Sequence, residues 1–391
     1  YTTTNIATDH NQLTMEIMQK VAAKHGLVCL LHEKPFAGVN GSGKHNNWSI
    51  ATDAGQNLLS PGATPYENAQ FLLFLCAVIK AVDDYQDLLR ISVATAGNDH
   101  RLGANEAPPA VVSIFLGDEL NAVLEAIETD TPYKGAEKTQ MKLGVDVLPK
   151  FNRDTTDRNR TSPFAFTGNK FEFRMVGSSD SVAGPNTILN AIVAEAFCEA
   201  ADVLENAEDF DLAVHDLIKE YMTKHQRIIF NGDGYADEWV AEAKRRGLPN
   251  IKNMVEAVDT LTTDKAVKLF ERFGIFAKVE LESRAEILYE TYAKTLNIEA
   301  MTMIDMASKQ ILPAVVKYTK VLADTVVAIN GAGADASVQV ELLNEVTDAA
   351  FIDTWNRVSN ECIRRIRAIA PDTIILFNNF SNLTQNFIIR R

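Results

Sequence analysis

The amino-terminal part of the chain changes between helical and extended hydrophobic patterns. From Asp9 to Lys24 the apolar residues recur about every four positions and Gly26 follows, which predicts an amphipathic helix that stops at a glycine. Residues 27–32 form a short apolar run and predict a buried strand. After a glycine-rich segment, residues 48–51 predict a second short strand.

A long apolar block predicts a helix over residues 65–82. Thr64 is expected to cap it, Pro65 to occupy its first turn and Glu67 to complete a capping box. Because the block is apolar nearly all round, this helix is expected to be buried on several sides. A further helix is predicted over 84–93, followed by a polar loop over 95–105.

The second half of the chain is predominantly helical in its pattern. Before it, residues 117–128 predict a helix, 129–162 predict an excursion over the surface, and 170–176 alternate polar and apolar residues as a strand does. A portion of mixed strands and helices is therefore expected to precede a largely helical one. The helices predicted in that second portion cover residues 186–206, 211–226, 235–246, 263–273, 279–296, 299–330 and 336–367.

Composition places the chain among ordinary globular proteins. It has 391 residues, of which 46% are hydrophobic and 23% charged. The formal net charge is -14 and the pI is near 5.0, which argues against nucleic-acid binding because phosphates are bound by clustered Lys and Arg. Any nucleotide site must therefore be a local basic pocket.

The cysteines and the hydropathy indicate a reducing, aqueous compartment. The four cysteines are far apart and form no C-x-x-C pair, so they are expected to be buried, reduced thiols. No stretch reaches the roughly 20 apolar residues that span a bilayer, and no charged leader precedes an apolar segment. These features predict a cytoplasmic protein without a membrane partner. The cysteines are Cys29, Cys76, Cys198 and Cys362.

The glycine-rich segment 38–45 nearly matches the phosphate-binding loop G-x-x-x-x-G-K-[ST]. It departs from that motif at its last position, where His45 replaces the hydroxyl that would bind magnesium, and no amphipathic helix follows. The segment instead offers a backbone that a substrate can approach closely, an imidazole and two amides that can meet a metal or a phosphate. The alternative to a ligand-binding loop is a tight turn between strands that carries polar side chains.

Residues 40–49, with the sequence N-G-S-G-K-H-N-N-W-S, resemble the signature loop of glutamine synthetases. The sequences of this loop and of residues 32–37 are similar to those of the type III branch of that family. Asn47 stands where many relatives have a histidine. The resemblance implies that glutamate is contacted by Asn40 and Gly41, that a metal ion is bound by His45, and that the ATP phosphates lie by Asn47 and Ser49.

Residues 98–108 resemble the flap that closes over the substrate in this family. The resemblance implies that Arg101 binds the glutamate carboxylate and that Glu106 takes a proton from ammonium. The chain is about one residue shorter than the family pattern between these two positions. Taken alone, a glutamate in a loop is usually a solvated surface charge.

Two later segments resemble the family in the expected order. Residues 158–162 resemble its R-N-R-S segment, which implies that Arg160 binds ATP and steadies the transferring phosphoryl group; guanidinium forks suit phosphate well. Ala165 stands where the family often has another arginine. Residues 170–174 resemble a strand on which Lys170 contacts ATP, Glu172 ligates metal and Arg174 meets the reacting carboxylate or phosphate. Alternation puts these three side chains on one face of the strand. A surface salt-bridge ladder is the alternative.

Taken together, these likenesses imply an α+β fold. Residues 1–184 are predicted to form part of a glutamine synthetase-like catalytic domain, which is an antiparallel sheet flanked by helices. Residues 185–350 are predicted to form a helical region. Residues 351–391 do not resemble the family's ending. The implied activity is the joining of ammonia to glutamate with ATP, through a γ-glutamyl phosphate, in nitrogen assimilation. The implied cofactor is Mg²⁺ or Mn²⁺, and the implied assembly is a homo-oligomeric ring whose active sites are shared between subunits.

The number of metal ligands sets a limit on this interpretation. A two-metal phosphoryl site needs several carboxylates, and in the family most of them precede the position that matches Tyr1. The chain reads as if it begins inside a domain, so weak or absent turnover is expected of residues 1–391 alone. Two alternatives remain open: a non-catalytic or incomplete subunit that keeps the fold, and a guanidino kinase-like phosphotransferase.

Overall fold

The computed structural model describes residues 3–36, 38–103, 106–133 and 161–347, together with two short strands at 376–378 and 386–388. The chain divides into two compact units, Tyr1–Ala285 and Glu286–Arg391. The boundaries expected after residues 184 and 350 stay predictions. The predicted surface excursion falls mostly on residues 134–160, which lie outside the described part, as does most of the tail from 351.

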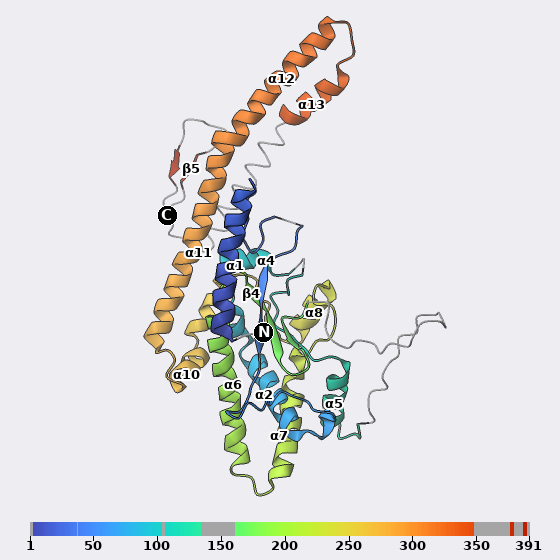
Figure 1. Ribbon diagram of the computed structural model, residues 1–391, viewed down its shortest axis with the longest axis vertical. Helices are drawn as coiled ribbons and strands as arrows, with labels where there is room; N and C mark the ends of the chain where they lie inside the picture. Colours follow the sequence, from blue (N-terminus) through green and yellow to red (C-terminus); the bar gives the residue numbers. More distant parts are fainter. Residues whose placement is uncertain are drawn as a thin grey trace, which may run out of the picture. The chain divides into compact units, whose positions relative to one another are not determined.

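A four-stranded sheet lies in the first unit (Figure 1), with the strand order β1-β4-β3-β2. The predicted strand over 170–176 is confirmed as β4, which pairs antiparallel with both β1 and β3. The pair β2 and β3 is parallel, which differs from the all-antiparallel expectation. A parallel pair needs a long crossover, and the chain between these strands contains helix α5 (Asp118–Glu128). The strands are β1 (Gly43–Trp48), β2 (Ile114–Phe115), β3 (Phe164–Phe166) and β4 (Phe171–Gly177).

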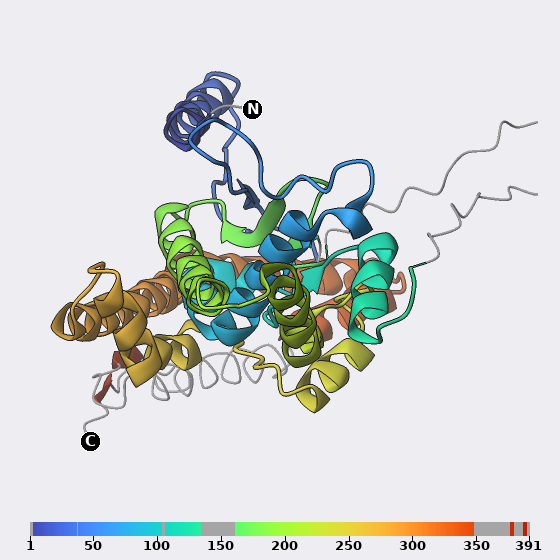
Figure 2. The same ribbon diagram turned by 90° about the horizontal axis from the view of Figure 1, so that it is seen from below.

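Helix α2 (Ala69–Asp84) is the centre of the helical packing in this unit. It packs against α6 (Ala183–Leu204) and α7 (Phe210–His225), which flank it in Figure 2. Its residues Phe71 and Leu75 are almost fully buried. The expectation of a helix buried on several sides is therefore confirmed.

The predicted start of this helix is wrong by one turn. Residues Pro65–Glu67 form a separate 3₁₀ turn, and the Thr64 side chain makes no capping bond. Asn68 caps α2 instead, because its Oδ1 accepts a hydrogen bond of 3.0 Å from the backbone N of Phe71.

The polar segment after residue 94 was expected to be a loop, and this is wrong for its first half. Residues Ala96–Arg101 form helix α4, which follows α3 (Gln86–Ile91). Thr95 caps α4 by accepting a hydrogen bond of 3.2 Å from the backbone N of Asn98. The helix predicted over 117–128 is confirmed as α5.

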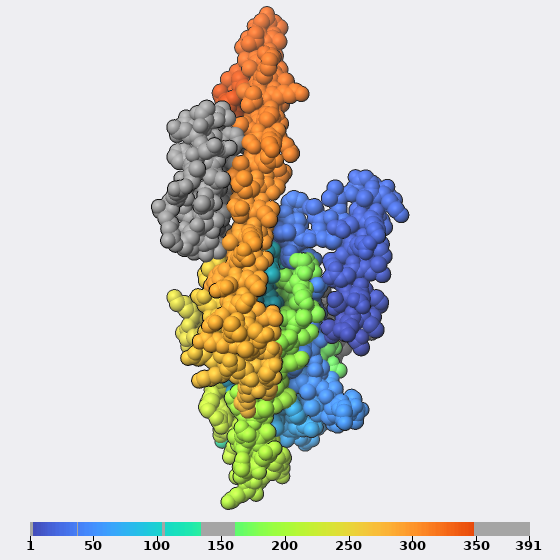
Figure 3. All heavy atoms as spheres, turned by 90° about the vertical axis from the view of Figure 1, so that its left-hand side faces the viewer, coloured from blue at the N-terminus to red at the C-terminus, as the bar shows by residue number. Residues whose placement is uncertain are grey.

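The strand expected over residues 27–32 does not form. Val28 in that run is 84% exposed, and no strand of the described residues lies beside it to accept its backbone hydrogen bonds. The preceding helix α1 (Thr4–Lys24) forms as predicted but has no buried residue; its dark blue atoms stand at the surface in Figure 3. Of the strand expected over 48–51, only Trp48 belongs to β1, and Ala51 forms an isolated bridge with Asn57.

The helices predicted over 186–206, 211–226, 235–246 and 263–273 are confirmed with small differences at their ends. The short helix Met254–Val258 was not predicted, and residues 348–367 of the helix predicted over 336–367 lie outside the described part of the chain. The predicted interruption near residue 297 is wrong, because a continuous helix α11 passes it and a π turn over Ala307–Ile311 separates α11 from α12. In the second unit α12 packs against α13, and β5 pairs antiparallel with β6. Within the described residues no helix is long and apolar enough to cross a membrane. The bounds are η2 Gln226–Ile228, α8 Asp237–Arg245, α9 Met254–Val258, η3 Asp259–Thr262, α10 Asp264–Arg272, α11 Lys278–Met306, α12 Leu312–Gly331, α13 Ser337–Thr347, β5 Leu376–Asn378 and β6 Asn386–Ile388.

Candidate functional site

The glycine-rich segment enters the sheet as strand β1. Asn40 and Gly41 precede the strand, and the backbone N of Ser42 donates to the carbonyl oxygen of Glu33 at 2.8 Å. The Lys44 ammonium donates to the carbonyl oxygen of Asp180 at 2.7 Å. That lysine therefore anchors a neighbouring loop, whereas the lysine of a phosphate-binding loop points into the phosphate site.

Three of the predicted site residues meet on one face of the β1–β4 pair. His45 Nδ1 lies 2.9 Å from Glu172 Oε1, and Arg174 Nε donates to the other carboxylate oxygen of Glu172 at 2.8 Å. The register of the two strands shifts between Lys44 and Asn46, on either side of His45. This irregularity changes the direction of one side chain without ending the strand.

The contact with His45 lowers the pKa of Glu172 to about 2. Partial burial of Glu172 works against this shift, and the charge and hydrogen bond of Arg174 add to it. Glu172 is therefore ionised at neutral pH. A partly buried carboxylate in contact with an imidazole is a donor set that hard divalent cations accept.

Three of the residues expected near ATP, Asn47, Ser49 and Lys170, lie at one end of the same strand pair. Asn47 is paired with Glu172 across the strands, so their side chains share a face. Ser49 Oγ donates to Asn57 Oδ1 at 2.8 Å, and the carbonyl oxygen of Asn169 lies 3.1 Å from it. Lys170 follows directly in the turn between β3 and β4. The structure brings these residues together, and their contact with ATP stays a prediction.

Arg101 lies beneath the glycine loop and is 3% exposed. Its Nη2 donates to the carbonyl oxygen of Arg174 at 3.0 Å, and its Nη1 lies 3.2 Å from that of Met175. A Cβ on Gly41 would lie 2.6 Å from Arg101 Cγ, and a Cβ on Gly43 would overlap the guanidinium. The glycines therefore serve to let the arginine pass under the loop.

One N–H of this arginine remains available. Arg101 Nε is buried and has no hydrogen-bond partner among the described residues. Burial lowers the pKa of Arg101, which the charges of Asp180 and Glu33 oppose. A buried donor without a partner is costly and suits an anionic ligand. Binding of the glutamate carboxylate by Arg101 stays a prediction.

The remaining predicted residues lie at the edges of the described segments. Glu106 is exposed and has a φ of 66°, an uncommon conformation for a residue with a side chain. Arg160 lies outside the described residues. The residue after it, Thr161, accepts a hydrogen bond of 3.0 Å from the backbone N of Gly234.

Two carboxylates close to Arg101, those of Glu33 and Asp180, were not predicted from the sequence. Glu33 is 4% exposed, and its Oε1 accepts hydrogen bonds from the backbone N of Ser179 at 2.9 Å and from the Ser179 hydroxyl. Burial works to raise the pKa of Glu33, but these donors outweigh it and the pKa falls below its usual value. Burial and the charge of Glu33 raise the pKa of Asp180. Glu33 belongs to residues 32–37, whose sequence resembles the type III branch, and this resemblance was the only indication that Glu33 lies near the site.

A second ionisable cluster joins α2 to α7. Ligand atoms of Asp83, Asp84 and His225 lie within 4.8 Å of one another. His225 Nδ1 lies 2.8 Å from Asp83 Oδ2, and Arg227 Nε lies 2.9 Å from the same oxygen. Lys80 neutralises Asp84 through an ion pair of 2.7 Å. Because two cationic side chains already balance these carboxylates, the cluster is a structural network.

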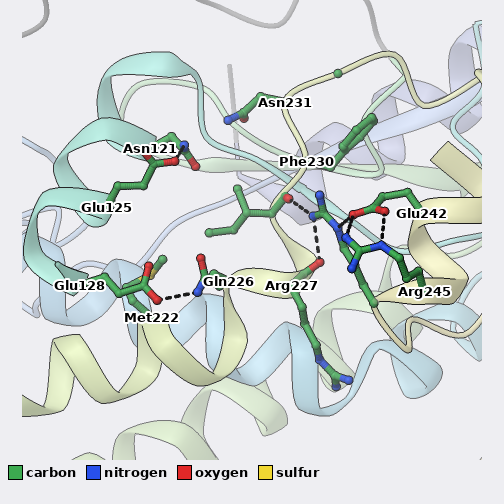
Figure 4. A pocket seen from close by; sticks show the side chains of 13 residues that line it. Asn121, Glu125, Glu128, Met222, Gln226, Arg227, Phe230, Asn231, Glu242 and Arg245 are labelled. Atoms are coloured by element: carbon green, nitrogen blue, oxygen red, sulfur yellow. Dashed lines mark hydrogen bonds and ion pairs between the residues drawn. The ribbon is translucent and has the colours of Figure 1, made fainter. Parts of the chain in front are cut away.

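A cavity of about 460 Å³ opens behind the segment that follows α7. Figure 4 shows Phe230 and Asn231 on its wall, with Glu242 and Arg245 paired beside them. Acidic and arginine side chains both line it: Glu242 pairs with Arg245 and Arg246, and Glu128 accepts a hydrogen bond from Gln226. The lining residues are Asn121, Glu125, Glu128, Met222, Gln226, Arg227, Ile229, Phe230, Asn231, Gly232, Glu242, Arg245 and Arg246.

Comparison with known proteins gives consistent matches. The family "Glutamine synthetase, catalytic domain" matches residues 1–110, and "Glutamine synthetase C-terminal domain" matches residues 213–330. The chain is 52% identical over 328 residues to "Type-3 glutamine synthetase" of Dictyostelium discoideum, which covers 83% of this chain and 45% of that protein. It is 52% identical over 332 residues to "Glutamine synthetase" of Butyrivibrio fibrisolvens, which covers 84% and 47%.

A solved structure titled "Apo GmaS without ligand" is 17% identical and superposes with a TM-score of 0.41, covering 74% of this chain and 50% of that one. The chain spans about half the length of the curated relatives it matches.

Proposed function

The chain belongs to the glutamine synthetase family, type III branch, and we propose that it forms one wall of a site that joins ammonia to glutamate with ATP. The observation that carries this proposal is the contact of His45 with Glu172 across β1 and β4 at 2.9 Å. The two residues are separated by 127 positions in the sequence. The family resemblance assigns both to metal binding, and the fold brings them together.

The donor set of this wall fits a divalent cation in part. Glu172 is ionised and His45 offers an imidazole nitrogen beside it, while Asn47 shares their face. Mg²⁺ or Mn²⁺ held by His45 and Glu172 would supply Lewis-acid stabilisation of phosphate oxygens. Arg174 binds one oxygen of Glu172 and thereby fixes the orientation of the carboxylate.

The residues of the chain then have separate tasks in the proposed reaction. Transfer of the γ-phosphoryl group of ATP to the unreactive side-chain carboxylate of glutamate makes an acyl phosphate and releases ADP. Ammonia then attacks the acyl carbon and displaces phosphate, which gives glutamine. We assign the substrate carboxylate to Arg101, whose Nε is buried without a partner beneath Gly41 and Gly43. Glu106 takes the proton from ammonium, so that a neutral amine can attack. Arg160 stabilises the charge on the transferring phosphoryl group.

Location and assembly extend the same proposal. We propose, from the family resemblance, that the protein is cytoplasmic, assimilates nitrogen and forms a homo-oligomer with active sites completed between subunits. Light scattering coupled to size-exclusion chromatography measures the assembly directly.

The proposal is tested by measuring glutamine and ADP formed from glutamate, ammonium and ATP. The assay uses this chain and, where this sequence is part of a longer protein, that protein. Glu172→Gln removes the charge but keeps the shape, and a loss of activity on the order of a hundredfold is expected for a residue proposed to hold the metal ion. Glu282→Gln, on an exposed helix face, is the matched control.

One result of this assay would contradict the proposal. If the longest available protein binds ATP with magnesium but forms no glutamine, the chain is a non-catalytic member of its family.

A further inference from the structure

Glu33 is a buried carboxylate that contacts three other segments of the first unit. The residue is only 4% exposed, and a glycine of each segment lies against it. A Cβ on Gly97 would lie 2.6 Å from Glu33 Oε2, and a Cβ on Gly177 would lie 3.0 Å from Glu33 Cγ. The third glycine is Gly41. Because side chains at these positions would fill the space that the carboxylate occupies, the glycines keep a place for Glu33.

The side chain of Glu33 binds the turn that follows β4. Its Oε1 accepts hydrogen bonds from the backbone N of Ser179 at 2.9 Å and from the Ser179 hydroxyl. The backbone N of Ser178, in the same turn, donates to the carbonyl oxygen of Ser42 at 3.2 Å. The turn that Glu33 holds is therefore itself bonded to the glycine loop, residues 40–43.

The main chain of Glu33 binds the glycine loop directly. Its carbonyl oxygen accepts a hydrogen bond of 2.8 Å from the backbone N of Ser42. Gly41 lies between this carbonyl and Arg101, since a Cβ on Gly41 would be 3.2 Å from Glu33 O and 2.6 Å from Arg101 Cγ. One residue thus holds the loop by two routes, through its own carbonyl and through the turn at Ser179.

Helix α4 brings Arg101 to the same place. It packs against β4 (Figure 1) and carries both Gly97, which lies against the Glu33 carboxylate, and Arg101. The Arg101 guanidinium donates to Asn98 Oδ1 and to backbone carbonyls of β4. The charges of Asp180 and Glu33 oppose the effect of burial on the pKa of Arg101, while its Nε keeps no partner among the described residues. The arginine therefore stays charged with one N–H available to an anion.

We propose that Glu33 is a positioning residue for the glutamate site, which holds the glycine loop over Arg101 through its carbonyl oxygen and through the turn that its carboxylate binds. This role rests on the proposed function, which assigns glutamate to Asn40, Gly41 and Arg101. Glu33 acts through Ser42 and Ser179, without a contact of its own to the substrate. The residues expected to meet the metal ion and ATP lie further along β1 and β4, so the loss of Glu33 affects glutamate selectively.

Hydrogen exchange tests the support of the loop without any need for activity. Glu33→Ala removes the carboxylate and keeps the carbonyl, so the Ser179 amide is expected to exchange roughly tenfold faster, because it loses a charged acceptor. The Ser42 amide keeps its acceptor but loses the support of the turn, and is expected to exchange roughly threefold faster. The amide of Phe71, capped by Asn68 on α2, is the internal control. Unchanged exchange at Ser42 overturns the proposal.

Kinetics test the consequence for the substrate. In the longest available protein, Glu33→Ala is expected to raise the KM for glutamate on the order of tenfold and to leave the KM for ATP within about twofold. Glu33→Gln keeps an oxygen for Ser179 and is expected to recover most of the glutamate affinity. Glu282→Ala removes an exposed carboxylate and should leave both constants unchanged. An equal rise in both KM values for Glu33→Ala would show general damage and reject the positioning role.

A second variant displaces the carboxylate while Glu33 stays in the chain. The methyl group of Gly97→Ala would lie 2.6 Å from Glu33 Oε2, so this variant is expected to speed exchange at Ser42 and Ser179 and to raise the KM for glutamate. Gly184→Ala, whose new methyl group has its nearest neighbour at 3.5 Å, is the matched control. If Glu33→Ala does not fold, Gly97→Ala decides: normal exchange and a normal KM for glutamate reject the role of Glu33.

The two proposals fail in different ways. If the wild-type protein forms no glutamine, the proposed function is rejected, and hydrogen exchange alone decides whether Glu33 holds the loop. If the wild type is active and Glu33→Ala matches it in exchange at Ser42 and in the KM for glutamate, only the role of Glu33 is rejected.

Discussion

At the scale of single residues, the absence of side chains in the glycine loop is as important as the side chains that are present. Gly41 and Gly43 lie directly over Arg101, whose guanidinium binds backbone carbonyls of β4. Glycine in such a loop is often explained by its conformational freedom, yet neither residue has a positive φ. The requirement here is space for the arginine.

Gly43→Ala is predicted to be destabilising by about 1–3 kcal/mol, the range for overpacking, because its methyl group would overlap the Arg101 guanidinium. Urea denaturation measures the change. Gly331→Ala, at the end of α12 with nothing within 4 Å of the new methyl group, is the control and should be neutral or slightly stabilising. A neutral Gly43→Ala would mean that Arg101 is easily displaced.

Glu172 predicts a dependence of stability on pH. Its pKa is lowered from 4.5 to about 2 in the folded protein, so its ionised form favours folding. That stabilisation is complete above pH 4.5 and is lost as the pH falls from there towards 2. The free energy of unfolding of wild type should therefore fall more steeply in this window than that of Glu172→Gln. Parallel curves for the two proteins would rule out the coupling to His45.

At the scale of elements, capping decides where helices begin. Both Thr64 and Asn68 precede the apolar block with a residue type that caps helices. Only Asn68 makes the bond, and Thr64 precedes a 3₁₀ turn instead. The sequence signal identified the helix correctly, and the choice between two caps depended on the packing of the chain that leads into it.

Asn68→Ala is expected to cost about 1 kcal/mol, the usual value for a lost cap, because the N–H of Phe71 loses its acceptor. Thermal unfolding measures the difference. Thr64→Ala should change the stability little, since its hydroxyl caps nothing. The reverse ranking of the two variants would support the capping box at Thr64 and contradict the observed start of α2.

At the scale of the whole molecule, the first unit is held together by contacts between residues far apart in the sequence. Asp83 is buried at the end of α2 and bonds to His225, the last residue of α7, and to Arg227 in the 3₁₀ turn η2 that follows. Such a network ties the two central helices of the unit to each other. Nothing in the spacing of these residues along the chain indicates it.

Asp83→Ala is predicted to destabilise the protein by about 2 kcal/mol. Removal of one partner of a buried ion pair often costs about 3–5 kcal/mol, and the cost is lower here because Arg227 is partly exposed and can turn towards water. Denaturant unfolding gives the value. Asp216→Ala, an exposed carboxylate beside His215, is the control and should stay within about 0.5 kcal/mol.

Much of the secondary structure could be predicted, because a helix or strand with one buried face has apolar residues that recur at its own period. The alternation of Phe171 and Phe173 with Glu172 and Arg174 identified β4, and the helical period identified α5, α6 and α7. The short strands β2 and β3 were missed, since two or three residues carry no period. The run 27–32 was mistaken for a strand because an apolar run specifies burial but does not supply a partner.

The candidate site, too, could be predicted from the sequence only in part. The sequence by itself determined which residue types are available, and the family resemblance assigned His45, Glu172 and Arg174 their expected chemistry. The folded chain alone reveals that β1 and β4 pair in a register that puts these groups in contact and that Arg101 is buried under glycines. The physical reason is that contacts between distant segments depend on register and packing, which a local pattern does not encode.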